Sequence, residues 1–157
     1  MTKSELSREA NRFRAAIEKT RDAGEFVPSR FKSERMNSFP YDCCDDAADL
    51  FTHYLYHEFG IDSIRIHATY YDEKLQRDCY HDWQKVNRWH VDLTGDQFDN
   101  DSSLPIKAGS VYVGMVDDFH RQFDIIEEKH SCGIECLGDG SWDRMYGLYN
   151  AIMKYMR

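Results

Sequence analysis

The segment from Phe39 to Gly60 places two adjacent cysteines where a helix is expected to begin. Asp42 is a favourable residue just before a first helical turn, and Gly60 is a natural stop after the last one. Cys43 and Cys44 therefore fall in the predicted first turn, where free backbone N–H groups and the helix dipole stabilise an anion such as a thiolate. The helical spacing is carried by Ala47, Leu50, Phe51, Tyr54 and Leu55.

Three carboxylates follow the cysteines closely and act against a reactive thiol. Asp45, Asp46 and Asp49 suit a helix N-terminus, but each of them disfavours another negative charge nearby. The helix start alone therefore does not make either cysteine a nucleophile. A base close to the sulfur is also needed.

Residues 80–94 supply a candidate base on a predicted β-hairpin. With a two-residue loop at 87–88, His81 and Asp92 become diagonal neighbours on one face, about 7–8 Å apart between backbones. Asp92 can then orient the imidazole of His81 and stabilise its charged form. A loop one residue longer would put the two side chains on opposite faces. The face that carries them is expected to hold His81, Trp83, Lys85, His90 and Asp92.

The motifs of this region, taken together, resemble those of papain-like and transglutaminase-like cysteine enzymes, and more narrowly small bacterial and phage proteins of that superfamily. The matching motifs lie within residues 39–115: a Phe-Pro before a helix-initiating Cys, a His-x-Trp beginning at His81, and an Asp-Leu-Thr-x-Asp-Gln-Phe run beginning at Asp92. The resemblance implies that Cys44 is the nucleophile, His81 the general base and Asp92 the orienting acid. It further implies a thiol protease or related hydrolase or acyltransferase that attacks an amide, peptide or isopeptide bond of a protein or peptide substrate. Neither a cofactor nor a metal is implied.

Acyl chemistry of this kind also needs hydrogen-bond donors for the negative charge that develops on the carbonyl oxygen. The backbone N–H of Cys44 is one candidate donor, and the side chains of Gln97 and Asn37 are candidates for the second. Trp83 is a candidate wall of the substrate groove, although core packing explains a tryptophan there equally well.

A different class of function is also consistent with the sequence. In an inactive papain-like scaffold, Cys44 would be only a buried apolar residue, and the protein would act as a protein-binding or immunity-type protein. Asp45 favours this alternative, because it stands where the resembling enzymes commonly have glycine and adds negative charge beside the thiol. The two functions differ in whether Cys44 reacts selectively below the ordinary thiol pKa of about 8.5.

Length and charge limit the classes of partner. A chain of 157 residues most often forms one domain with a sizeable core. The formal net charge of −8 argues against nucleic acid or an anionic membrane as the main partner. No apolar stretch follows Met1, so neither a signal peptide nor a membrane span is expected. We therefore expect a cytoplasmic protein whose five cysteines are free thiols. The sequence carries no indication of oligomeric state.

The remaining patterns predict a single α+β domain of papain-like type over residues 1–157, with N-terminal helices packed on an antiparallel β-sheet. Residues 1–37 form a helix and a basic connector, 38–126 the cysteine helix and the sheet, and 127–157 a loop and a C-terminal helix. The expected helices span 5–23, 43–59 and 141–156, and the expected strands span 63–71, 80–86, 89–94, 111–114 and 121–126.

Metal sites have weaker support in the sequence. The acidic run from Asp92 to Asp101 lacks the glycine and terminal glutamate of an EF-hand loop. Cys132 and Cys136, with His130 nearby, resemble part of a zinc site, but a fourth ligand and a tighter C-x₂-C pair are missing.

Two histidines on the cysteine helix also have metal-ligand spacing. His53 and His57 lie four residues apart and therefore share one helix face. Tyr54 stands where the H-E-x-x-H motif of zinc proteases needs glutamate, so that motif is absent. The chain also lacks a phosphate-binding glycine loop and a G-x-S-x-G motif, which argues against the common nucleotide-binding and serine-hydrolase classes.

Overall fold

The computed structural model describes residues 1–29, 32–138 and 140–157, and it has an α+β fold. The N-terminal helix α1 (Lys3–Asp22) starts two residues earlier than expected because Thr2 and Glu5 form a capping box. The Thr2 hydroxyl accepts a hydrogen bond from the Glu5 N–H at 3.2 Å, and the Glu5 carboxylate accepts one from the Thr2 N–H at 2.7 Å. The predicted apolar stripe of α1, which includes Phe13 and Ile17, is fully buried.

The cysteine helix α2 (Cys44–Phe59) begins one residue later than the sequence pattern suggested. Asp42 is not the residue that caps it, because its φ of 57° places it in the left-handed region. Cys43 occupies the cap position, and Cys44 is the first helical residue. The expected stop is confirmed, since Gly60 closes the helix with a φ of 66°.

The five strands of the described residues form one antiparallel sheet in the order β4-β3-β2-β1-β5, as the short connections predicted. The two-residue loop at 87–88 is confirmed, with Val86 paired to Trp89. The predicted strand at 121–126 is displaced, because residues 120–122 form a short 3₁₀ helix and the strand runs from Asp124 to Ser131. The strands are β1 (Ser63–Asp72), β2 (Arg77–Val86), β3 (Trp89–Asp92), β4 (Tyr112–Gly114) and β5 (Asp124–Ser131).

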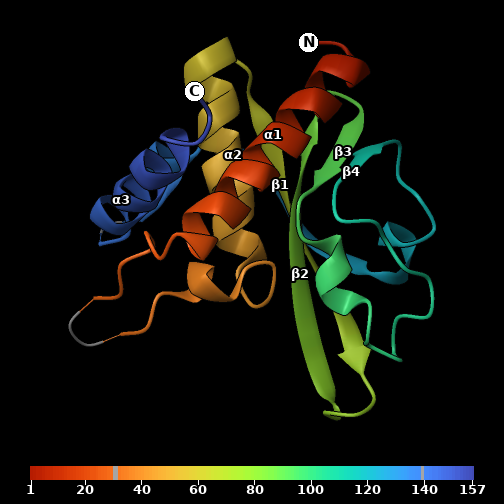
Figure 1. Ribbon diagram of the computed structural model, residues 1–157. Helices are drawn as coiled ribbons and strands as arrows, with labels where there is room; N and C mark the ends of the chain where they lie inside the picture. The colour runs from red at the N-terminus through yellow and green to blue at the C-terminus, as the bar shows by residue number, and fades with distance from the viewer. Residues whose placement is uncertain (30–31, 139) are drawn as a thin grey trace.

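The sheet has a core on each face. Helices α1, α2 and α3 (Trp142–Met153) lie on one side of it, and the long connection after β3 lies on the other (Figure 1). On the helix side, Val86, Val91 and Leu93 pack with the helices. The second core contains Ile66, Ala68, Tyr70, Trp83, Phe98, Leu104, Phe119 and Phe123.

Strand β2 therefore presents its side chains to two different environments. Successive strand residues point to opposite faces, so Asp82, Gln84 and Val86 face the helices while His81 and Trp83 face the second core. This division decides which predicted site residues can meet.

Two of the five cysteines are not the free thiols that were expected. Cys132 and Cys136 are joined by a disulfide, which also excludes them as the zinc ligands considered from the sequence. Their loop contains the 3₁₀ helix η4 (Ile134–Cys136). Cys43, Cys44 and Cys79 are free.

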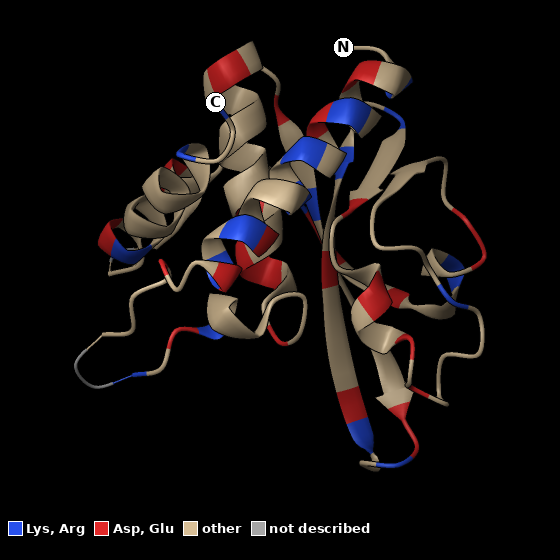
Figure 2. Cartoon of the chain, viewed as in Figure 1, with Lys and Arg blue, Asp and Glu red and all other residues tan. Residues whose placement is uncertain are grey.

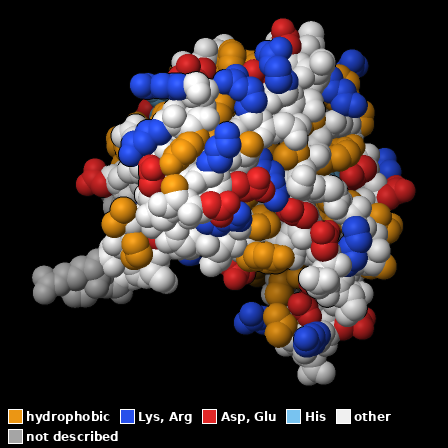
Figure 3. Space-filling view, viewed as in Figure 1, with side chains coloured by type: hydrophobic (Ala, Val, Ile, Leu, Met, Phe, Trp, Pro, Cys, Tyr) orange, Lys and Arg blue, Asp and Glu red, His pale blue; other side chains and the backbone are white. Residues whose placement is uncertain are grey.

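The surface mixes charges of both signs. Basic and acidic residues are interspersed along α1 (Figure 2), where Arg8 and Arg12 both pair with Glu9. The face drawn in Figure 3 likewise carries both signs, with scattered hydrophobic side chains between them. Among the described residues, no helix combines the length and apolarity needed to cross a membrane.

Candidate active site

The histidine and aspartate predicted to share one hairpin face do meet. His81 Nε2 lies 2.7 Å from Asp92 Oδ2, and both side chains are buried. The contact follows from the two-residue loop, which gives the hairpin the register in which residues 81 and 92 share a face. The backbone of Asp92 also pairs with Tyr112 of β4.

A second histidine binds the same carboxylate and was not anticipated from the sequence. His120 Nε2 lies 2.8 Å from Asp92 Oδ2, and His120 Nδ1 lies 2.6 Å from Asp117 Oδ1. Burial acts to lower the pKa of His120, but its hydrogen bonds to Asp117 and Asp92 outweigh burial and raise that pKa to about 9. Burial acts to raise the pKa of Asp92, but pairing with His81 and His120 holds it far below its usual range. Asp92 is therefore a fixed, ionised acceptor.

The other ring nitrogen of His81 has no hydrogen-bond partner among the residues that the structure describes. The imidazole is enclosed by aromatic rings, with the Phe98 centroid at 4.9 Å and the Phe123 centroid at 5.3 Å. A buried polar atom without a partner is costly in free energy and uncommon in folded proteins. Nδ1 of His81 is thus buried without a partner while Nε2 is fixed on Asp92.

The structure does not bring the Cys44 sulfur into hydrogen-bond contact with His81. Cys44 Sγ lies 3.8 Å from Asp82 Oδ2, the side chain that follows His81 on β2 and points to the other face. The backbone N–H of Asp82 also faces the sulfur and acts to lower the pKa of Cys44. Cys44 is therefore placed beside the strand backbone that separates His81 from Asp82.

The environment of both free helix-start thiols disfavours a thiolate. Burial and then the charge of Asp82 raise the pKa of Cys44 far above its usual range. Burial, followed by the charges of Asp46 and Asp45, raises the pKa of Cys43 to about 12. Cys43 is 0% exposed in the helical core, whereas Cys44 is only partly buried. Of the two, Cys44 is the one that a reagent could reach.

Asp82 links the thiol to a polar cluster that sequence patterns did not reveal. Asp82 Oδ1 lies 2.7 Å from His67 Nδ1, and Asp82 Oδ2 lies 3.5 Å from Arg65 Nη2. Arg65 also binds Asp49 of α2. The cluster borders a cavity of about 210 Å³ that is also lined by Glu127 and Lys129. The cluster arises because β1 pairs His67 directly with Asp82, a register that no local signal in the sequence fixes.

The three accessory candidates are engaged elsewhere. Gln97 Nε2 donates to the Thr94 carbonyl at 3.1 Å, and Asn37 Nδ2 donates to the Phe26 carbonyl at 2.8 Å. Trp83 is 1% exposed and belongs to the second core, so it does not form the wall of a substrate groove.

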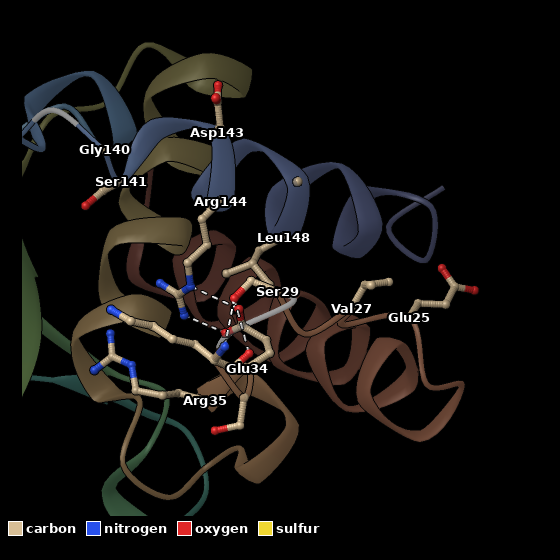
Figure 4. Close-up of a pocket in the computed structure, with 13 residues that line it drawn as sticks. Glu25, Val27, Ser29, Glu34, Arg35, Gly140, Ser141, Asp143, Arg144 and Leu148 are labelled. Atoms are coloured by element: carbon tan, nitrogen blue, oxygen red, sulfur yellow. Dashed lines mark hydrogen bonds and ion pairs between the residues drawn. The ribbon is translucent and has the colours of Figure 1, made fainter.

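The larger cavity, of about 740 Å³, lies between the basic connector and α3 (Figure 4). Its lining residues do not include Cys44, His81 or Asp92. At its edge Arg144 Nε donates to Glu34 at 2.9 Å, and Arg144 also binds Asp46. The arginines Arg35 and Arg144 thus balance the acidic first turn of α2, so the cavity is better explained by this ion-pair network than by thiol chemistry.

Two groups of side chains in the described residues bring metal-ligand atoms within 4.8 Å of one another. In the fully buried group of His81, Asp92 and His120, both histidines already hydrogen-bond the carboxylate. The second group combines the buried His53 with the more exposed His57 and Glu135, and here too both histidines contact the carboxylate. The comparisons add no identification, because no protein-family model, curated protein or solved structure matches this chain.

Proposed function

We propose that the protein is a cysteine-dependent hydrolase or acyltransferase of papain-like type, in which Cys44 is the nucleophile, His81 the general base and Asp92 the orienting acid. The observation that carries the proposal is the His81 ring, which is fixed on Asp92 through Nε2 and has an unpartnered, buried Nδ1. A base in this position needs one nitrogen held and the other free to receive a proton.

The first step requires a rearrangement that brings Cys44 Sγ and the His81 ring to the same side of β2, because the sulfur lies with Asp82 on the helix face and the ring points to the second core. Nδ1 takes the thiol proton, and the resulting imidazolium is stabilised by the ionised Asp92. The thiolate then attacks an amide carbonyl, and the backbone N–H groups of Cys44 and Asp82 are the proposed donors for the oxyanion. Collapse of the tetrahedral intermediate returns the proton from Nδ1 to the leaving amine. Water or a second amine finally releases the acyl group from the sulfur, giving hydrolysis or acyl transfer.

A second function is favoured by the present position of the sulfur. Asp82 and burial both stabilise the neutral thiol of Cys44. An inactive papain-like scaffold that serves as a protein-binding or immunity-type protein needs no thiolate, and it accommodates this contact without any rearrangement.

Alkylation of Cys44 by iodoacetamide, mapped by mass spectrometry across pH, separates the two functions. An enzyme is expected to label at Cys44 selectively and below the ordinary thiol pKa of about 8.5, and His81→Ala should abolish this selectivity. His67→Ala is the matched control, because His67 lies near the same thiol but outside the proposed triad. Slow labelling that is unchanged in His81→Ala, in a variant shown by circular dichroism to be folded, would favour the scaffold.

A further inference from the structure

A cluster of two histidines and a glutamate, away from Cys44, His81 and Asp92, joins α2 to the disulfide loop. His53 and His57 lie one helical turn apart, with ring centroids separated by 4.0 Å. Glu135 of η4 reaches both of them: its Oε2 lies 3.1 Å from His53 Nδ1, and its Oε1 lies 2.9 Å from His57 Nε2. Three ligand-type atoms from two separate segments therefore converge on one point.

The loop that carries Glu135 is built to approach α2 closely. Gly133 has a φ of +96°, and a Cβ at this position would lie 2.4 Å from the Cα of His53. The Cys132–Cys136 disulfide encloses the same loop. Tyr146 of α3 donates its hydroxyl hydrogen to Glu135 Oε1 at 2.8 Å. The carboxylate is thus oriented by a glycine contact, a covalent link and a hydrogen bond from a third segment.

We propose that His53, His57 and Glu135 form a binding site for a first-row divalent transition-metal ion of the zinc class. Imidazole nitrogen favours such ions over Ca²⁺ or Mg²⁺. Zinc bonds of about 2.0–2.2 Å in a tetrahedron place neighbouring ligand atoms roughly 3.3–3.5 Å apart, so the observed spacings need only a small outward movement. His57 is 45% exposed and Glu135 34%, which leaves the fourth position to solvent. The site has three protein ligands and is open, in contrast to a closed structural zinc site.

Metal binding can be measured on the full chain after treatment with EDTA, without reductant so that the disulfide is kept. Titration calorimetry with Zn²⁺ is expected to show one ion per chain, and Co²⁺ should give visible d–d absorption bands. Because loss of a supporting side chain alone weakens metal binding by 10–100-fold, His57→Ala and Glu135→Gln should each weaken it by about 100-fold or more. His130→Ala is the matched control, since His130 is an exposed histidine outside the cluster that pairs with Asp62, and its binding should equal that of the wild type.

A thermal shift and a thiol variant complete the test. Zn²⁺ should raise the Tm of the wild type and of Cys44→Ser, but not that of His57→Ala. Substoichiometric binding by the wild type overturns the proposal, as does binding that survives both cluster variants. Loss of binding in Cys44→Ser also overturns it, because the ion would then be held by the thiol. None of these outcomes depends on whether the thiol mechanism is correct.

Discussion

At the scale of single residues, one carboxylate contacts the sulfur of the proposed nucleophile. Asp82 contacts Cys44 Sγ with one oxygen and His67 with the other. The thiol and the imidazole therefore share an acceptor in place of exchanging a proton. The sulfur therefore lies beside Asp82 and apart from His81, although His81 and Asp82 are adjacent on β2.

Asp82→Asn is expected to increase the alkylation rate of Cys44 by about tenfold or more at pH 8. Removing the nearby negative charge lowers the pKa of the thiol, and each unit of pKa raises the thiolate fraction tenfold while the thiol remains mostly protonated. The rate of Cys44 alkylation is measured by quenching iodoacetamide reactions at successive times and mapping the modified peptides. Asp78→Asn, an exposed carboxylate on the same strand, is the control and should leave the rate unchanged. Equal rates in both variants would show that burial alone protects the sulfur.

Because the pKa of His120 is raised, we expect the folded protein to lose stability above neutral pH. Its pKa is raised from 6.5 to about 9 in the folded protein, so its stabilising contribution is complete below pH 6.5 and is lost as the pH rises to about 9. Over this window the wild type should lose on the order of 3 kcal/mol more of its unfolding free energy than His120→Gln does. Urea denaturation at pH 6.5 and 9.5 measures the difference.

The exposed His130 offers a matched substitution for this experiment. His130→Gln should keep the alkaline decline of the wild type. A decline of the same size in His120→Gln would assign the effect to other groups, such as the buried thiols.

At the scale of secondary-structure elements, local signals predicted more than long-range pairing did. The C-terminal end of α2 at Gly60 and the two-residue hairpin loop were predictable because helix stops and turns act within a few residues, whereas the predicted cap Asp42 was wrong. The same locality made the His81–Asp92 contact predictable. His67, Asp82 and His120 were missed because their contacts depend on the β1–β2 register and on a 3₁₀ turn before β5. A periodic pattern specifies which face a residue occupies, but it does not specify what covers that face.

The loop around η4 gives a prediction about element docking. Gly133→Ala should destabilise the protein by about 2 kcal/mol or more, because the added methyl group collides with the α2 backbone and the φ of +96° is strained for alanine. Thermal unfolding followed by circular dichroism measures the change. Gly138→Ala is the control in the same region, since a Cβ at Gly138 meets nothing within 4 Å, and it should alter stability by less than about 0.5 kcal/mol.

At the scale of the whole molecule, the sheet is buried on both faces by unlike layers. Helices cover one face, and a long connection with little regular structure covers the other. The α+β class and the antiparallel sheet were predictable from alternating patterns. The second core was not, because Phe98, Phe119 and Phe123 lie outside the strands and the longer helices, in segments with no regular apolar spacing.

The second core is expected to contribute strongly to global stability. Phe119→Ala should lower the unfolding free energy by about 3–5 kcal/mol, because Phe119 is 1% exposed and packs against Phe98 and Phe123. Phe59→Ala, at a phenylalanine that is 44% exposed, should cost far less. Chemical denaturation of the two variants makes the comparison. A cost for Phe119→Ala no greater than for Phe59→Ala would mean that the long connection folds independently of the sheet.

The order of the strands leaves β4 and β5 at the two margins of the sheet. A strand at the edge of a sheet has unpaired backbone N–H and C=O groups, to which a strand of another chain can add and form fibrils. Here one margin is only three residues long, and the other carries Asp124, Glu127, Glu128 and Lys129 along an exposed ribbon. The shortness of β4 and the charges of β5 thus disfavour the addition of strands from other chains. Neutralising the carboxylates of β5 is the change expected to promote polymerisation of this protein.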